Sequence, residues 1–263
     1  MRIHPSNLIN AIKNIKNWFE YALHKRDVRK HTMIFTAKPY AIKMEVDAGN
    51  YSVFKEIFIE DFYKIKQILK GLPAALTIID IGANEGFFAA MILSKTKQAV
   101  IHAYEPLPDN VNKIKRLIEI NPSVSGKIVL NNAAVSDGKL KTLKLFIQKE
   151  NSESSTASIL EDFDARNISS IEVASTSLEE IFIKNNLNEV HLLKMDCEGA
   201  EYPILYSAPV NILKKIKRIL AEVHLLDNNT RNVDHLAKYL EGNGFKISTS
   251  LFNNGCYYMI AVQ

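Results

Sequence analysis

The chain has 263 residues, of which 47% are hydrophobic and 24% charged, and its formal net charge is +4. This composition is ordinary for a globular protein with a sizeable core, and so mild a charge does not by itself indicate a nucleic-acid partner. Two cysteines, Cys197 and Cys256, argue against a disulfide framework. No stretch approaches the ~18 to 20 continuous apolar residues of a transmembrane helix, and the opening MRIHPSNLIN lacks the apolar core of a secretory signal. We therefore expect a soluble cytoplasmic protein.

Residues 1–70 predict an N-terminal extension, and residues 71–263 predict the main domain. The extension opens with an amphipathic helix, whose apolar face consists of Leu8, Ile12, Ile15, Phe19 and Leu23. A basic run at 24–31 makes this segment a candidate for peripheral membrane contact. We favour packing on the main domain or on a second subunit of a homo-oligomer, because most amphipathic helices are half-buried. Segments 32–36 and 40–46 predict a hairpin, and 53–69 predicts another amphipathic helix.

From Thr77 onward, strand patterns alternate with helix patterns, which is typical of a mostly parallel sheet. The strands expected in this sheet are 76–81, 99–104, 127–135, 189–196, 216–224, 245–250 and 256–262. Helices are expected at 87–97, from Asp109, from Ser177 and around 232–241. An interruption holds an added strand at 140–148, a polar loop at 149–158 and a short strand at 171–175. The loop is long enough to form a lid.

The first strand of this sheet runs into a glycine loop of the form Gly82-x-x-x-Gly86. The dinucleotide fingerprint G-x-G-x-x-G and the P-loop ending G-K-[ST] are both absent, which disfavours a nicotinamide oxidoreductase. Asp80 precedes the first glycine, where it would repel a diphosphate and suit a cationic amino group. Glu105 ends the next strand and can accept hydrogen bonds from both hydroxyls of a ribose. An amino-acid tail at one loop and a ribose at the next describe S-adenosylmethionine.

Four segments, DIGANEGFF, YEPLPDNV, LLKMDCEGAEYPIL and AEVH, occur in this order along the chain. In that order they resemble the FkbM-like family of S-adenosylmethionine-dependent methyltransferases, and the resemblance covers roughly residues 50–263. It implies a Rossmann-like class I methyltransferase fold, with a seven-stranded mostly parallel sheet whose last strand is antiparallel. It also implies methyl transfer to a hydroxyl oxygen, usually on a sugar, glycolipid or polyketide. Glu85 departs from the family, which more often has an apolar residue there.

The resemblance also assigns cofactor contacts to the loops that follow the first three strands. The methionine part would be surrounded by Asp80, Gly82, Asn84 and Gly86, with the ribose on Glu105. The adenine would meet the end of the third strand, at Asn132, Ala133, Ala134 and Val135. The alternative for the glycines is a tight turn without a ligand, and the alternative for Asp80 is a structural loop carboxylate.

The catalytic candidates lie at the carboxyl ends of the fourth and fifth strands, where ligands bind in open α/β sheets. Lys194 and Asp196 share one side of the fourth strand, and Glu222 and His224 share one face of the fifth. Because these strands are neighbours, Asp196, Glu222 and His224 should converge. We favour a base role, in which His224 or Asp196 takes the hydroxyl proton and Glu222 orients the imidazole.

Two alternatives to base catalysis stay open for these residues. Asp196, Glu222 and His224 could hold Mg²⁺ or Mn²⁺, by analogy with catechol-type O-methyltransferases. They could also form a hydrogen-bonded structural cluster.

The prediction for function is an S-adenosylmethionine-dependent O-methyltransferase acting on a hydroxyl, with saccharide or glycoconjugate acceptors, as in polysaccharide modification. One alternative is a nucleic-acid or protein methyltransferase, although strand four reads KMDCEG and lacks the [N/D]-P-P-[Y/F] motif of amino-group methylases of bases. We expect no nucleic-acid partner, since no basic patch is interleaved with aromatic residues. The other alternative is an adaptor that binds S-adenosylmethionine without catalysis.

Overall fold

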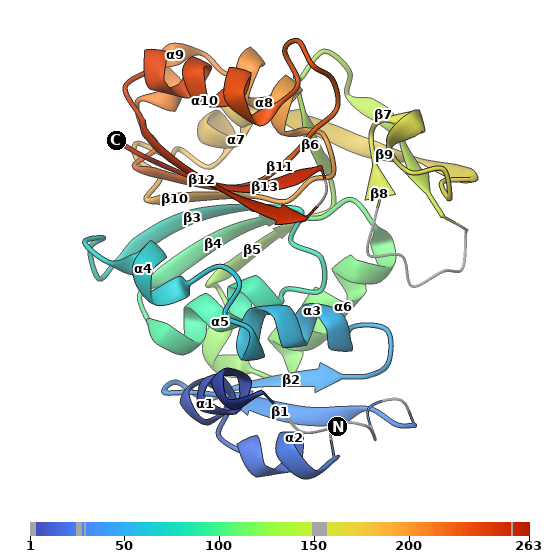
Figure 1. The fold of residues 1–263 in the computed structure, drawn as a ribbon, viewed down its shortest axis with the longest axis vertical. Coiled ribbons are helices and arrows are strands. Elements are labelled where there is room, and N and C mark those ends of the chain that lie inside the picture. The colour runs from blue at the N-terminus through green and yellow to red at the C-terminus, as the bar shows by residue number, and fades with distance from the viewer. Residues whose placement is uncertain (1–3, 25–27, 29, 149–156, 254) are drawn as a thin grey trace. The chain divides into compact units, whose positions relative to one another are not determined.

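The computed structural model describes residues 4–24, 28, 30–148, 157–253 and 255–263 (Figure 1). The chain divides into two compact units. The first consists of Met1–Leu76, Ala83–Ile101 and Asp109–Val129, and the second of Thr77–Gly82, His102–Pro108 and Leu130–Gln263. The expected division into an extension and a main domain at residue 70 stays a prediction.

Seven strands form the central sheet, in the order β12-β13-β11-β10-β3-β4-β5. Their bounds are β3 Leu76–Ile81, β4 Ala99–Tyr104, β5 Ile128–Asn131, β10 Leu192–Met195, β11 Arg218–His224, β12 Lys246–Asn253 and β13 Cys256–Val262. β10 pairs in parallel with β3 and β11, whereas β13 is antiparallel to both β11 and β12. The side chains of β3 and β10 are almost all buried, and both strands are apolar apart from Thr77, Asp80 and Lys194. The expected seven-stranded sheet with an antiparallel last strand is confirmed.

The first unit contains the expected hairpin, β1 (Met33–Ala37) paired antiparallel with β2 (Ile42–Val46). Its helices are α1 Pro5–Asn14, α2 Trp18–His24, α3 Tyr51–Phe54, η2 Lys55–Ile59, α4 Ile65–Leu69, α5 Phe87–Lys95, α6 Pro108–Glu119 and η3 Pro122–Val124. Figure 1 shows α1 and α2 beside this hairpin. The buried rings of Phe35 on β1 and Phe54 on α3 stack with their centroids 4.9 Å apart.

Two helices that the sequence predicts as continuous are broken. The helix expected from residue 5 ends at Asn14, because Ile15 is extended (φ −117°, ψ 130°) and forms a β-bridge with Ala37. The predicted apolar face is accordingly split: Ile15 is buried, whereas Leu23 is 75% exposed. The helix expected at 53–69 breaks into α3, η2 and α4, with Lys64 in the left-handed region at φ 48°.

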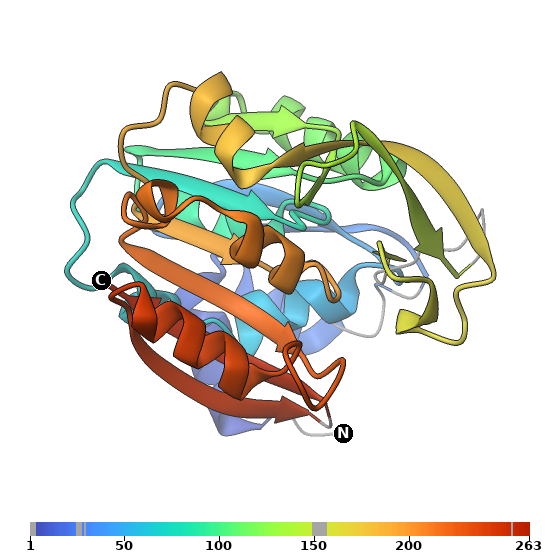
Figure 2. The ribbon, with the colours of Figure 1, turned by 90° about the horizontal axis from the view of Figure 1, so that it is seen from above.

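The second unit carries a further sheet, in the order β6-β9-β7-β8. The bounds are β6 Ala134–Ser136, β7 Thr142–Ile147, β8 Ala157–Ser158 and β9 Ser169–Ser177, with η4 at Glu161–Phe163. Figure 2 shows the long β9 running beside β7, with which it pairs antiparallel. The strand expected at 140–148 is confirmed as β7, and the short one at 171–175 is part of β9. Most of the expected lid, residues 149–156, lies outside the described residues.

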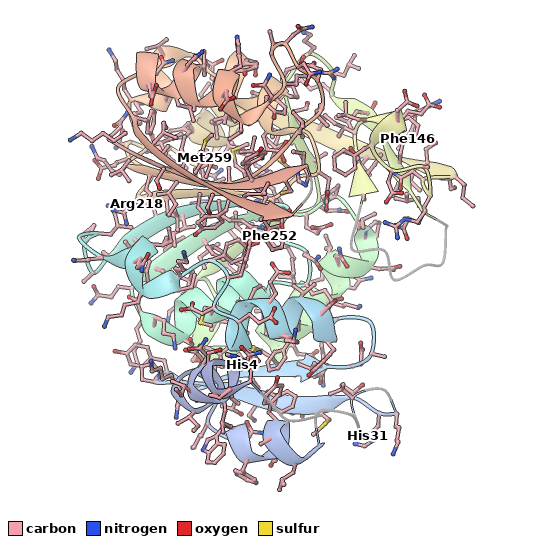
Figure 3. The ribbon with its side chains drawn as sticks, in the orientation of Figure 1. His4, His31, Phe146, Arg218, Phe252 and Met259 are labelled. Carbon is pink, nitrogen blue, oxygen red and sulfur yellow. The ribbon has the colours of Figure 1, made fainter. Side chains whose placement is uncertain are left out.

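Four helices of the second unit pack around one apolar cluster with β10, β11 and β13: α7 Leu178–Lys184, α8 Glu201–Ser207, α9 Val210–Leu213 and α10 Val233–Gly242. Met259 on β13 is fully buried in this cluster, whereas Phe252 on β12 is 43% exposed (Figure 3). Ser177 caps α7 as expected, in a capping box with Glu180. Among the described helices, none has both the length and the hydropathy needed to cross a membrane.

Candidate active site

The glycine loop begins at Gly82, beside the residue that follows β10. Gly82 has φ +72°, and a Cβ atom placed on it would lie 1.8 Å from the carbonyl oxygen of Asp196. No side chain fits in that space, and the positive φ itself disfavours one. Glycine at position 82 is therefore required by the contact between the ends of two neighbouring strands, whether or not a ligand binds there.

A buried ion pair lies under this loop. β3 and β10 place Asp80 opposite Lys194, and the two residues are 0% and 3% exposed. The Lys194 Nζ atom donates to the carbonyl of Gly82 at 2.7 Å and lies 3.3 Å from Oδ1 of Asp80. It also lies 3.7 Å from Oδ2 of Asp196. Lys194 thus contacts the glycine loop and the acidic residues at the ends of β3 and β10.

The charges in this cluster shift one another's pKa values. Burial raises the pKa of Asp80, and the Lys194 ammonium opposes the rise. Burial lowers the pKa of Lys194, but the surrounding carboxylates, Asp80 first, outweigh it and raise the value. Both carboxylate oxygens of Asp80 are buried, and the Lys194 ammonium lies 3.3 Å from Oδ1. The Lys194 ammonium is thus the counter-ion of the buried Asp80 carboxylate.

The second half of the loop adopts left-handed backbone conformations within the first unit. Asn84 has φ 49° and Gly86 has φ 83°. Gly86 precedes the first residue of α5, and a Cβ on it would lie 3.1 Å from the Leu117 side chain. Between them, Glu85 contacts Asn50 and Lys113. The cofactor roles of Asn84 and Gly86 stay predictions.

Glu105 is held in place at the end of β4. It is 4% exposed, and its Oε1 accepts a hydrogen bond from the Leu107 backbone N–H at 2.9 Å. The Asn132 amide donates to the carbonyls of Glu105 and Pro106, at 3.0 and 2.9 Å. The Asn132 side chain therefore fixes the turn that carries Glu105, a contact that the sequence did not indicate.

A cavity of about 710 Å³ borders the residues predicted to meet adenine. It is lined by Tyr104, Leu130, Asn131, Asn132, Ala133, Lys141, Ala174, Ser175, Thr176, Glu180, Ile183 and Lys184. Ala134 is instead buried in β6, among the apolar side chains of the second sheet. The structure therefore brings Asn132 and Ala133 to this cavity and leaves Ala134 out of it.

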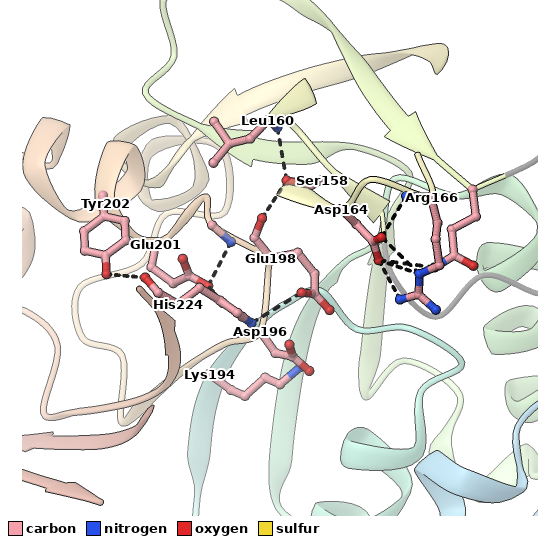
Figure 4. Close-up of polar contacts among 12 residues, drawn as sticks. Ser158, Leu160, Asp164, Arg166, Lys194, Asp196, Glu198, Glu201, Tyr202 and His224 are labelled. Carbon is pink, nitrogen blue, oxygen red and sulfur yellow. Dashed lines mark hydrogen bonds and ion pairs between the residues drawn. The ribbon is translucent and has the colours of Figure 1, made fainter. Parts of the chain in front are cut away.

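His224 lies between two carboxylates at the end of β11 (Figure 4). Its Nδ1 is 2.9 Å from Oε1 of Glu201, and its Nε2 is 3.3 Å from Oε2 of Glu198. Strand alternation predicts Glu222 as the partner of the imidazole. In the structure the partners are instead Glu198, in the turn after β10, and Glu201, at the start of α8. Glu222 is buried, and its charge is among those that raise the pKa of Lys194.

This arrangement favours the protonated imidazole. Burial by itself lowers the pKa of His224, but hydrogen bonds with Cys256 and Glu201 and the nearby carboxylates outweigh it and raise the value to about 12. Burial, followed by the charge on Asp196, raises the pKa of the Glu198 carboxyl to about 8. Nδ1 of the protonated His224 faces the Glu201 carboxylate and Nε2 faces the carboxyl group of Glu198, so this ring is poorly placed to act as a base.

The segment 157–166 packs against the turn that holds Glu198. The Ser158 hydroxyl donates to the carbonyl of Glu198 at 2.6 Å, and the Phe163 ring meets the His224 ring edge-on, 5.1 Å away. A Cβ on Gly199 would lie 2.8 Å from the Leu160 side chain. The sequence did not single out Phe163, because no local pattern shows which residues of a polar insertion return to the sheet.

The metal site predicted from Asp196, Glu222 and His224 is not assembled. Among the residues that the structure describes, no group of three or more histidine, cysteine, aspartate or glutamate side chains is arranged to hold a metal ion. The cause is local: the His224 nitrogens face Glu201 and Glu198, and Asp196 lies beside the Lys194 ammonium.

Residues 80–247 match the family model described as the methyltransferase FkbM domain. The chain belongs to the FkbM methyltransferase family. Methyltransferase sdnD of Sordaria araneosa is 24% identical over 225 residues, which cover 74% of this chain and 82% of that protein. The AMB antimetabolite synthetase AmbE of Pseudomonas aeruginosa is also 24% identical, over 230 residues that cover 74% of this chain and 10% of AmbE.

A solved structure confirms the fold of this FkbM methyltransferase. The crystal structure of methyltransferase FkbM from Methylobacillus flagellatus superposes with a TM-score of 0.50 at 13% identity, and the match covers 81% of this chain and 55% of that one. The chain thus spans about a tenth of AmbE and about half of the solved FkbM chain.

Proposed function

We propose that this FkbM methyltransferase transfers a methyl group from S-adenosylmethionine to a hydroxyl oxygen of a small-molecule or glycan acceptor. The observation that carries the proposal is the pair of buried carboxylates, Asp80 and Glu105, at the ends of two neighbouring strands in the sheet order. The choice of a saccharide, and with it a role in polysaccharide modification, follows from the family resemblance.

The residues at these strand ends fit the cofactor. The carboxylate of Asp80, held beside the Lys194 ammonium, carries a negative charge suited to the amino group of the methionine part. Glu105 is oriented by the Leu107 N–H and suits the ribose hydroxyls. Asn132 and Ala133 line a cavity large enough for an adenine ring. When bound, S-adenosylmethionine supplies a methyl group already activated by a sulfonium, so the protein needs only to position the acceptor and receive its proton.

Asp196 is the residue that we propose receives the proton. It follows β10, its side chain is 29% exposed, and its Oδ2 lies 3.7 Å from the Lys194 ammonium, which holds it beside the glycine loop. His224 was the other candidate, and its position between Glu201 and Glu198 favours a role in fixing the turn after β10. Lys194 acts as a positioning residue in this scheme, and Glu222 contributes its charge to the cluster.

The acceptor would approach the turn that carries Glu198, where Phe163 contributes a partly exposed ring and the Asp164 carboxylate is paired with Arg166. The two cysteines are unpaired thiols, which supports a reducing cytoplasmic compartment.

The test uses a panel of mono- and oligosaccharides and non-sugar alcohols with radiolabelled S-adenosylmethionine. We expect methylation of a hydroxyl acceptor by the wild type and a loss of about 100-fold or more in Asp196→Asn, the usual contribution of a general base. Binding of S-adenosylhomocysteine should survive in that variant. The matched control, Asp162→Asn, changes an exposed aspartate of η4 and should remain fully active.

Two outcomes contradict parts of this proposal. A fully active Asp196→Asn would remove that residue as the proton acceptor. Cofactor binding without transfer to any acceptor in the panel would instead favour an adaptor that binds S-adenosylmethionine.

A further inference from the structure

Glu85 is a buried charge in the middle of the glycine loop. It is 8% exposed and lies between Asn84 and Gly86, both of which have left-handed backbone conformations. A carboxylate removed from water is costly unless ionic and hydrogen-bonding partners compensate it. The partners of Glu85 therefore influence the conformation that the loop can adopt.

Two side chains from distant parts of the first unit supply that compensation. The Asn50 amide donates to Oε2 of Glu85 at 2.5 Å, and the Lys113 ammonium lies 2.6 Å from Oε1. Asn50 precedes α3, in the segment before residue 71, and Lys113 lies on α6. Each carboxylate oxygen of Glu85 thus has its own partner, which restrains the rotation of the side chain.

Asn50 is itself held rigidly. It is 4% exposed, its Oδ1 accepts from the Asp47 N–H at 2.9 Å, and its amide also donates to the Glu45 carbonyl at 3.2 Å. Asp47 in turn accepts from the Gly49 N–H at 2.9 Å. The turn after β2 therefore presents the Asn50 amide to Glu85 in a fixed position.

We infer that Glu85 is a positioning residue for cofactor binding, held by Asn50 and Lys113 so that the glycine loop keeps its shape. This inference rests on the proposed function, because the loop is the proposed contact for the methionine part of S-adenosylmethionine. It assigns the turn after β2 to the cofactor-binding machinery. It also explains why a charged residue is compatible with position 85, where an apolar one is more usual in the family.

Two ion pairs made by Arg116 provide a matched comparison. Arg116, one turn beyond Lys113 on α6, contacts Glu45 at 2.9 Å and Glu119 at 2.9 Å, and its side chain is 50% exposed. Glu85, Asn50, Lys113, Glu45 and Arg116 all border the same cavity of about 120 Å³. The Arg116 pairs are of the same chemical kind but do not involve the glycine loop.

The experiment measures S-adenosylhomocysteine affinity by calorimetry in the full-length wild type and in Lys113→Ala, Asn50→Ala, Lys113→Arg and Arg116→Ala. Removing one of the two partners of the buried Glu85 carboxylate should weaken binding about tenfold in each of the first two variants. Lys113→Arg keeps the charge and should bind within about twofold of the wild type, as should Arg116→Ala. Thermal unfolding is recorded for every variant, and hydrogen exchange of the amides at 83–87 reports on the loop itself.

The outcomes separate this inference from the proposed function. A wild type that binds no cofactor overturns both. A wild type that binds, together with Lys113→Ala and Asn50→Ala variants of unchanged affinity, overturns the inference and leaves the proposed function standing. Equal losses in Lys113→Ala and Arg116→Ala would show general destabilisation, which also overturns it. Faster loop exchange and weaker binding in Lys113→Ala and Asn50→Ala, with recovery in Lys113→Arg, support it.

Discussion

His224 should remain protonated through neutral pH, with Glu201 as a principal cause. Glu201 is fully buried and its Oε1 lies 2.9 Å from Nδ1 of His224. Glu201→Gln keeps the size of the side chain and removes its charge. A hydrogen bond to a charged group contributes about 1.5 to 3 kcal/mol, and a difference of one in pKa corresponds to about 1.4 kcal/mol. The pKa of His224 should therefore fall by about 1 to 2 in this variant.

The assay is a pH titration of the histidine side-chain nitrogens by two-dimensional NMR in ¹⁵N-labelled protein. His224→Gln removes one set of signals and so assigns the residue. Glu189→Gln is the matched control, because Glu189 lies 3.3 Å from His191 in a more exposed pair and should leave His224 unchanged. A wild-type His224 that titrates at or below its ordinary pKa of 6.5 would refute the electrostatic argument.

Further predictions concern pH, backbone space and the cofactor. The pKa of Glu198 is raised from 4.5 to about 8, so its contribution to stability is complete below pH 4.5 and is lost as the pH rises through 8. Urea midpoints should thus fall more between pH 6 and 9 in the wild type than in Glu198→Gln, and the reverse order would contradict this. Gly82→Ala should lower the free energy of unfolding, measured in urea, by about 3 kcal/mol or more, because the new Cβ would lie 1.8 Å from the Asp196 carbonyl oxygen. A variant with the urea midpoint of the wild type would disprove that clash. Glu105→Gln should weaken S-adenosylhomocysteine binding about tenfold in calorimetry without changing the melting temperature, and equal affinity would remove the ribose contact.

Much of the fold was predictable because its signals are local. The apolar run of β3, the glycine loop and the alternating strand and helix patterns each follow from a few consecutive residues. The break after Asn14 was not predictable, since Ile15 leaves the helix to form a bridge with Ala37, a residue of the later hairpin. Helical periodicity carries no information about such a tertiary pairing.

The candidate site shows the same limit. Strand alternation correctly brings Lys194 and Asp196 together, and it cannot specify which carboxylates meet His224. Those carboxylates come from a turn in which Glu198 has φ 50°, and from Glu201 in the first turn of α8. The spacing E-G-A-E after a buried strand was a usable signal, although a carboxylate in the first turn of a helix is also explained by the helix dipole.

The most direct test of the central claim is calorimetric titration of the purified protein with S-adenosylmethionine and S-adenosylhomocysteine, with NAD⁺ as the comparison ligand. We expect both sulfur compounds to bind in the micromolar range, about −8 kcal/mol, and NAD⁺ not to bind. Absence of binding by both sulfur compounds, or binding of NAD⁺ alone, would contradict the assignment of the strand-end carboxylates to this cofactor.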